Sequence, residues 1–192
     1  MNAERREIRQ WSDVALIERI VGVRHTRRIY SGSLQPLFDV GLVDVAHTKL
    51  AAARELVKRL LNEELKSRNA LTSPGAVRDY LRLHFAGKEH ECFGALFLDA
   101  QNRMIAFEEL FRGTLTQTSV YPREVVKTAL RHNAAAVILS HNHPSGVADP
   151  SVQDQALTRT LAEALGVVDI KVLDHFIIAG AATVSFAERG LV

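Results

Sequence analysis

Residues 140–154 read SHNHPSGVADPSVQD, and the rest of the sequence can be arranged around them. The apolar run before them, residues 134–139, is typical of a buried strand. After the loop, the segment that begins at Ser151 has the pattern of a helix as far as about Leu165. The stretch therefore predicts a strand, a loop rich in Gly and Pro, and a helix, with polar side chains where the strand ends.

Two histidines and one carboxylate are the candidate functional residues of this stretch. Residues two apart in an extended chain point the same way, so the side chains of His141 and His143 can face one point. The loop can bring Asp154, in the first turn of the helix, to the same point. Two histidines, a carboxylate and one open position form a known type of catalytic zinc site. The pattern favours a metal site, although His-x-His alone is weak evidence for one.

Asp154 also has a purely structural interpretation. Ser151-x-x-Asp154 before an apolar run is the pattern of a helix capping box. In such a box Ser151 accepts from the amide of Asp154, and the carboxylate reaches back to the amide of Ser151. We expect Asp154 to serve either the cap or a metal ion, but not both. The residues alone leave the two interpretations open.

The rest of residues 71–192 alternates between strand and helix patterns. Ser73-Pro74 predicts a helix start, and the residues after Pro122 predict a second helix. Strands are expected at 91–99, 103–111, 114–120, 170–173, 176–179 and 183–186. The order predicts an α/β fold with a mixed sheet covered by helices on both faces. Active sites of such sheets lie at the carboxyl ends of strands, where His141 and His143 fall.

Residues 1–70 have the pattern of a small all-helical region. Ser12-Asp13 predicts a helix start, and apolar residues from 45 to 66 form one stripe with charges opposite. Residues 1–70 carry 13 Lys and Arg residues against 9 Asp and Glu residues, an excess that permits contact with DNA without requiring it. We place the domain boundary at residues 69–73, giving domains 1–70 and 71–192.

Composition excludes several classes of protein. The single cysteine, Cys92, rules out an internal disulfide framework and a cysteine-cluster zinc finger. It also rules out the Cys-x-x-Cys ligands of zinc deaminases. No apolar run approaches the roughly 20 residues of a membrane span, and the N-terminus is charged rather than signal-like. We expect a cytoplasmic protein without membrane contact.

Several blocks of the sequence resemble a known family. His141-x-His143-Pro144 followed by Ser151-x-x-Asp154 resembles the JAMM motif of JAB1/MPN-domain zinc metalloproteases. More closely, residues 71–192 resemble the RadC (UPF0758) family, through residues 96–99, 110–114, 120–126, 141–146, 173–175 and 184–190. The resemblance implies a JAB1/MPN fold, a mixed sheet flanked by helices with a cytidine-deaminase-like architecture. It also implies that residues 12–61 are a remnant of the family's helix-hairpin-helix region, without its glycines between Val43 and Lys49.

The resemblance also implies roles for individual residues. His141, His143 and Asp154 would be zinc ligands, with water in the fourth place. Ser151 would hydrogen-bond that water or the developing oxyanion. Glu91 matches the family's upstream glutamate, the general base, for which the residues alone offer Glu108 and Glu109 as rivals.

Two functions follow as hypotheses. The first is a zinc-dependent hydrolase that cleaves a peptide or isopeptide bond with a zinc-activated water. The alternative is a non-catalytic or DNA-associated accessory protein of the DNA-repair type, with a structural or vestigial zinc site. A two-metal nuclease is disfavoured because the site offers one carboxylate ligand. We interpret Asp174-His175 as a structural pair within a core strand, while a role behind the metal ligands stays open.

Overall fold

The computed structural model describes residues 11–32, 45–113 and 120–192. The chain divides into two compact units, Met1–Val57 and Lys58–Val192. Within the described residues, no helix combines the length and the apolar character that crossing a membrane requires.

The first unit contains α2 (Asp13–Val21), α3 (Val23–Ile29) and the beginning of α4 (Val45–Ser67). Ser12 caps α2 by accepting a hydrogen bond from the amide of Ala15 at 3.3 Å, so the predicted helix start at Ser12-Asp13 is confirmed. Gly22 has a φ of 89° and separates α2 from α3. The small core of this unit consists of buried apolar residues from α2 and α4: Ile17, Val21, Ala46 and Leu50.

The second unit is built on a five-stranded sheet in the order β2-β1-β3-β4-β5. The strands are β1 (Cys92–Leu98), β2 (Met104–Arg112), β3 (Ala136–Asn142), β4 (Lys171–Ala179) and β5 (Ala182–Ser185). β3 and β4 are parallel, and every other neighbouring pair is antiparallel. The predicted mixed sheet is therefore confirmed.

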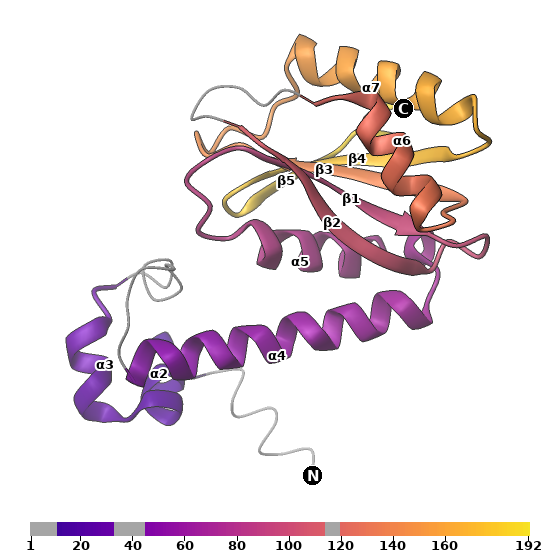
Figure 1. Cartoon of the computed structure of the whole chain (residues 1–192). Helices are drawn as coiled ribbons and strands as arrows, with labels where there is room; N and C mark the ends of the chain where they lie inside the picture. The colour runs from indigo at the N-terminus through magenta and orange to yellow at the C-terminus, as the bar shows by residue number, and fades with distance from the viewer. Residues whose placement is uncertain (1–10, 33–44, 114–119) are drawn as a thin grey trace. The chain divides into compact units, whose positions relative to one another are not determined.

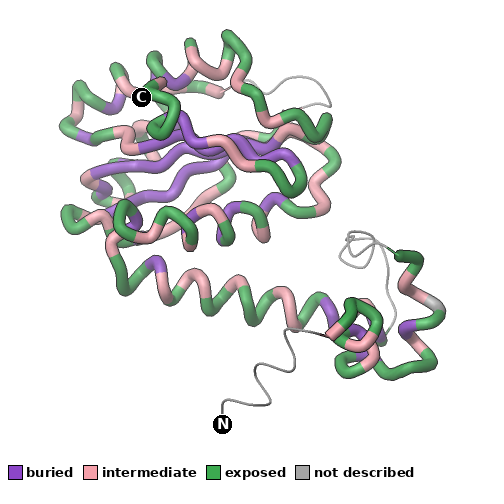
Figure 2. The backbone as a smooth tube through the Cα atoms, turned by 180° about the vertical axis from the view of Figure 1, so that it is seen from behind, coloured by how far each residue is buried: buried purple, intermediate pink, exposed green. Residues whose placement is uncertain are grey.

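Helices cover both faces of this sheet (Figure 1). α5 (Pro74–Phe85) packs on one face, and α6 (Pro122–Arg131) and α7 (Val152–Gly166) pack on the other. The alternation of side chains along β1 divides the core, since Phe93 and Phe97 face α6 and α7 whereas Leu96 and Leu98 face α5. Figure 2 shows the buried strands enclosed between these helices.

The described residues of the second unit also include two short helical turns. The turns are η2 (Ala70–Thr72) and η3 (Ala187–Arg189). The strands expected at 170–173 and 176–179 form one continuous strand, β4. The apparent break is an irregularity in the ladder, where Val137 pairs with Val172 but Ile138 pairs with Asp174. The strand expected at 114–120 lies almost wholly outside the described residues, which omit 114–119.

The connection β3-α7-β4 positions the candidate site. β3 and β4 are parallel neighbours, so α7 must cross between them on one face of the sheet. The loop from β3 to α7 therefore starts at the carboxyl end of β3. His141 and Asn142 are the last two residues of β3, and Val152 is the first of α7. This puts a strand end and a helix start side by side, as the sequence predicts.

Candidate metal centre

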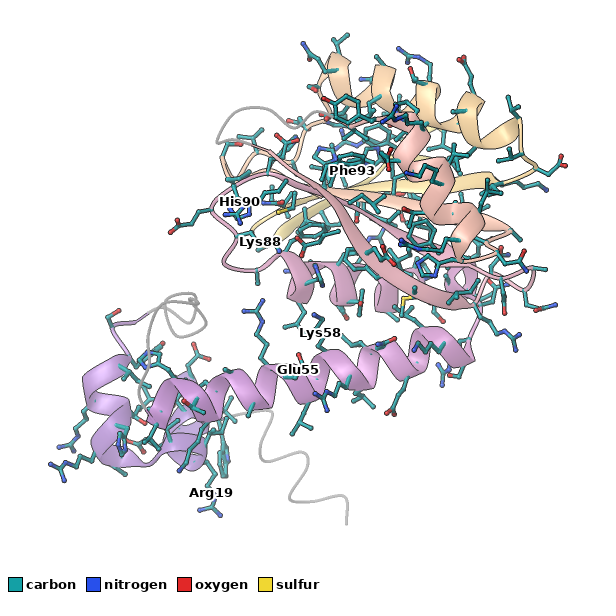
Figure 3. The ribbon with its side chains drawn as sticks, viewed as in Figure 1. Arg19, Glu55, Lys58, Lys88, His90 and Phe93 are labelled. Carbon is teal, nitrogen blue, oxygen red and sulfur yellow. The ribbon has the colours of Figure 1, made fainter. Side chains whose placement is uncertain are left out.

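His141 lies in the core on the face of the sheet that α7 covers. Its residue is 1% exposed, and its ring stacks on Phe93 with centroids 6.4 Å apart and an interplanar angle of 15°. Phe93, which is labelled in Figure 3, belongs to β1 and pairs with His141 in the ladder between β1 and β3. The packing leaves Nε2 of His141 aimed at the loop, because Nδ1 lies 2.8 Å from Nε2 of His175.

His143 is held in one orientation by two main-chain contacts. Its amide donates to the carbonyl of Ile178 at 2.8 Å, and Nδ1 of its ring lies 2.7 Å from the carbonyl oxygen of Val147. A carbonyl oxygen can only accept, so Nδ1 carries the ring proton and Nε2 of the neutral ring has a free lone pair. Nε2 of His143 lies 2.9 Å from Nε2 of His141. The expectation that the two imidazoles face one point is met.

Asp154 takes part in the capping box and in the site at once. Its Oδ2 accepts from the amide of Ser151 at 2.8 Å and from the Ser151 hydroxyl at 2.6 Å. Its amide donates to Oγ of Ser151 at 3.1 Å, which completes the box. The other oxygen, Oδ1, lies 3.2 Å from Nε2 of His141. Oδ2, the oxygen that the cap uses, also lies 3.7 Å from Nε2 of His143. The capping box therefore does not turn Asp154 away from the two histidines, and whether this carboxylate serves the cap, a metal ion or both stays a prediction.

The electrostatics of Asp154 favour its charged form. Burial by itself raises the pKa of this carboxyl, but the contact with His141 and the hydrogen bonds from Ser151 outweigh burial and hold the pKa of Asp154 well below its ordinary value. The carboxylate is therefore ionised at neutral pH.

These three side chains could hold a metal ion. One nitrogen each from His141 and His143 and one oxygen from Asp154 lie within 4.8 Å of one another. Two imidazole lone pairs and a carboxylate repel one another unless a cation, either a proton or a metal ion, lies between them. Imidazole nitrogen and carboxylate oxygen are ligand types that suit Zn²⁺, and zinc in enzymes often keeps three protein ligands. The donor set fits zinc.

Glu91 lies directly before β1, at the end of the sheet where β3 finishes. The side chain of Asn142 contacts the main chain on both sides of Glu91: its Oδ1 accepts from the amide of Cys92 at 2.8 Å, and its Nδ2 donates to the carbonyl of His90 at 3.0 Å. The carbonyl of Glu91 itself accepts from the amide of Gly113 at 2.8 Å. The Asn142 side chain thus fixes the segment that carries Glu91 to the strand that carries His141.

The rival carboxylates, Glu108 and Glu109, lie on β2, and β1 separates β2 from β3. Glu108 contacts Arg131 at 2.7 Å and His132 at 2.6 Å, at the carboxyl end of α6. Glu109 contacts residues of α5 and the turn that follows it. These contacts direct both carboxylates toward helices α5 and α6.

The sequence left open whether the pair Asp174-His175 contacts the metal ligands. Adjacent residues of a strand face opposite sides, so the pair Asp174-His175 is divided. Asp174 accepts from the hydroxyl of Ser185 at 2.6 Å and from the amide of Ala187 at 2.9 Å, which is a structural role. His175 faces α7 and contacts His141. The alternation of strand residues is the signal that could have separated the two.

Comparison with known proteins places these residues in a larger group. The sequence model of the RadC-like JAB domain family matches residues 71–191, a range that contains the whole candidate site. A UPF0758 protein of Thiobacillus denitrificans is 63% identical over 150 residues, which are 78% of this chain and 67% of that protein. A UPF0758 protein of Dechloromonas aromatica is 61% identical over 161 residues, which are 83% of this chain and 71% of that protein.

Proposed function

This chain belongs to the RadC-like JAB domain family, and on that premise we propose that it is a zinc-dependent hydrolase that cleaves a peptide or isopeptide bond. The observation that carries the proposal is the meeting of His141, His143 and Asp154, whose ligand atoms lie within 4.8 Å of one another. Two neutral nitrogens and one carboxylate, held by a strand end and a helix start, leave room in the coordination of zinc for a water molecule.

The three ligands would act as a rigid set. His141 is fixed by burial and stacking, His143 by the carbonyl of Val147, and Asp154 by the cap of α7. Zinc held there would supply Lewis acidity, which lowers the pKa of water from 15.7 to about 7 and polarises a carbonyl group. Because the ligands are already positioned, little reorganisation is needed on binding.

Glu91 would be the general base. Its carboxylate would take a proton from the attacking water and pass that proton to the leaving amine. Asn142 supports this role, since its side chain fixes both main-chain neighbours of Glu91. Ser151 donates its single hydroxyl proton to Oδ2 of Asp154, so it would hold that ligand and accept from the bound water rather than donate to the developing oxyanion.

The experiment is metal analysis combined with a hydrolysis assay. Wild-type protein from zinc-replete medium should contain about one zinc per chain, and His141→Ala and Asp154→Asn should lose it. His25→Ala, in α3 of the other unit, is the matched histidine control and should keep the metal. Glu91→Gln should keep zinc while losing cleavage of a library of peptide and isopeptide substrates.

Two results would count against the proposal. A metal-free wild type would refute the zinc site itself. A wild type that holds zinc but cleaves nothing in the library, with Glu91→Gln indistinguishable from it, would instead favour the non-catalytic or DNA-associated role.

A further inference from the structure

We propose that Thr158 and His175 are positioning residues of the metal centre, which together fix His141 as the tautomer that offers Nε2 to the metal. The inference rests on the proposed function, because it takes His141 as a ligand. Thr158 and His175 are themselves neither metal ligands nor the general base. They belong to a series of hydrogen bonds that runs from α7 through β4 to the ligand His141 on β3.

The direction of this series of hydrogen bonds is set at Thr158, on α7. Its hydroxyl lies 2.7 Å from the main-chain carbonyl oxygen of Asp154, one helical turn earlier. A carbonyl oxygen can only accept, so the single proton of the Thr158 hydroxyl is donated to it. Thr158 is 1% exposed, so water offers no competing acceptor. Oγ1 of Thr158 is therefore left as an acceptor for any further contact.

His175 makes that further contact. Its Nδ1 lies 2.7 Å from Oγ1 of Thr158, and because Oγ1 accepts, Nδ1 must carry a proton. His175 is 0% exposed and its ring lies against Phe93 and Phe186, with centroids 5.7 Å and 4.7 Å away. A second ring proton would place a charge among apolar side chains, which is unfavourable. The ring is thus a neutral imidazole with a free lone pair on Nε2.

The series of hydrogen bonds ends at His141. Nδ1 of His141 lies 2.8 Å from Nε2 of His175, so Nδ1 donates its proton there and Nε2 of His141 is left unprotonated. That nitrogen is the one that faces Nε2 of His143 and Oδ1 of Asp154. If each hydrogen bond of this series were donated in the opposite direction, Nε2 of His141 would carry the proton and could not bind a metal ion.

The same series of hydrogen bonds joins two ligands that belong to different elements. It begins at the main chain of Asp154, on α7, and ends at the ring of His141, on β3. Ligand histidines commonly donate their second ring nitrogen to a partner behind the site, and losing that partner weakens metal binding about 10- to 100-fold. Here a neutral histidine takes the place of the usual carboxylate or carbonyl, and Thr158 is needed to orient it.

The first test measures zinc affinity by competition with a chelating dye at fixed pH. Thr158→Val keeps the shape of the side chain and removes the hydroxyl, so zinc should bind about 10- to 100-fold more weakly. Thr158→Ser keeps the hydroxyl and should stay within about threefold of the wild type. Urea unfolding of the metal-free variants checks that both are folded. A Thr158→Val protein with wild-type affinity would overturn the assignment.

The second test needs no variant, and so stands even if Thr158→Val does not fold. In ¹⁵N–¹H spectra of the metal-free wild type, the ring of His175 should show its proton on Nδ1. A purely structural role for Thr158 would not determine which nitrogen carries the proton, and a proton on Nε2 of His175 would overturn the assignment. A wild type without zinc affinity would instead refute the proposed function, and this inference with it.

Discussion

The hydroxyl of Ser151 donates to Oδ2 of Asp154 at 2.6 Å, and the contact leaves Oδ1 as the carboxylate oxygen that the cap does not use. Oδ2 accepts from the cap of α7 and lies 3.7 Å from Nε2 of His143, while Oδ1 lies 3.2 Å from Nε2 of His141. Helix capping and metal binding are therefore coupled through one side chain. A change in the cap should be measurable at the metal centre.

Ser151→Ala tests this coupling. The variant removes the hydroxyl that both caps α7 and orients Asp154, so the free energy of unfolding should fall by about 1 kcal/mol. Zinc affinity should fall about 10-fold, because the carboxylate can then rotate. Urea unfolding of the metal-free protein and a zinc titration measure the two effects. Ser151→Thr keeps the hydroxyl and serves as the control; loss of stability without any change in affinity would show that the cap and the site are independent.

Asn142→Ala should separate stability from metal binding. Asn142 is 4% exposed and its side chain bonds the main chain at His90 and Cys92, so the variant loses both hydrogen bonds. We expect the free energy of unfolding to fall by about 2–3 kcal/mol. Zinc affinity should change less than about threefold, because Asn142 faces the opposite side of β3 from His141.

The same variant also tests the role of Glu91. If Glu91 is the general base, Asn142→Ala should lower kcat more than it changes KM, since the base is displaced while the ligands stay. Asn142→Asp is a useful comparison, because it keeps the acceptor for the Cys92 amide and loses the donor to the His90 carbonyl. An unchanged kcat in a folded, zinc-loaded Asn142→Ala protein would argue against Glu91.

The sequence predicted those parts of the site that depend on local order. His141 and His143 are two residues apart at a strand end, and Asp154 is in the first turn of the next helix, so short-range rules bring them together. The mixed sheet followed from the alternation of strands and helices. These features need no knowledge of how distant segments pack.

What could not be predicted depends on contacts between distant segments. Asn142 bonds residues 50 and 52 positions earlier, and His175 contacts His141 across 34 positions. No local pattern specifies such contacts. The polar pair Asp174-His175 looked like an interruption because neither partner, Ser185 for one and His141 for the other, is near in the sequence. Buried polar residues of a strand are the hardest to assign, because the partners that satisfy them come from other elements.

The contacts of the Glu109 carboxylate should contribute to stability in a way that depends on pH. Its Oε1 lies 2.6 Å from Nε2 of His84 and 2.5 Å from Nζ of Lys88. The hydrogen bond from His84, followed by the contacts with Lys88, lowers the pKa of Glu109 to about 2 despite the opposing effect of burial. Burial lowers the pKa of His84 as well, so at neutral pH His84 is a neutral donor and Lys88 supplies the charge.

Glu109→Gln should therefore be less stable than the wild type at neutral pH, and the difference between the two proteins should disappear at low pH. A lowered folded-state pKa contributes stability that is full above the unfolded value of 4.5 and is lost as the pH falls toward about 2. The side chain is 34% exposed, so screening reduces the effect, and we expect about 1 kcal/mol at pH 7. Urea unfolding from pH 7 to pH 2 should show the two proteins converging. Glu89→Gln, on the exposed turn before β1, should change nothing beyond about 0.5 kcal/mol; a constant offset at every pH would mean that charge is not the cause.

Gly94→Ala should destabilise the sheet next to the metal centre. Gly94 lies on β1, at a register irregularity of the ladder with β2 and opposite Ser140 of β3. A Cβ at this position would lie 2.7 Å from Cζ of Phe107 and 2.9 Å from the main-chain oxygen of Glu108. The Phe107 ring could shift, but the Glu108 oxygen belongs to the neighbouring strand and can move only if the ladder between β1 and β2 is distorted. We expect a loss of about 2–3 kcal/mol in the free energy of unfolding.

Gly75→Ala is the matched control for this substitution. Gly75 lies in the first turn of α5, and a Cβ there would meet no atom within 4 Å. The same chemical change should therefore stabilise the protein slightly, by about 0.5 kcal/mol, because alanine loses less backbone freedom on folding. Urea unfolding of both metal-free variants gives the comparison. If Gly94→Ala were as stable as Gly75→Ala, β1 and β2 would have to accommodate a Cβ where they now touch, and the close approach would not be what requires glycine at this position.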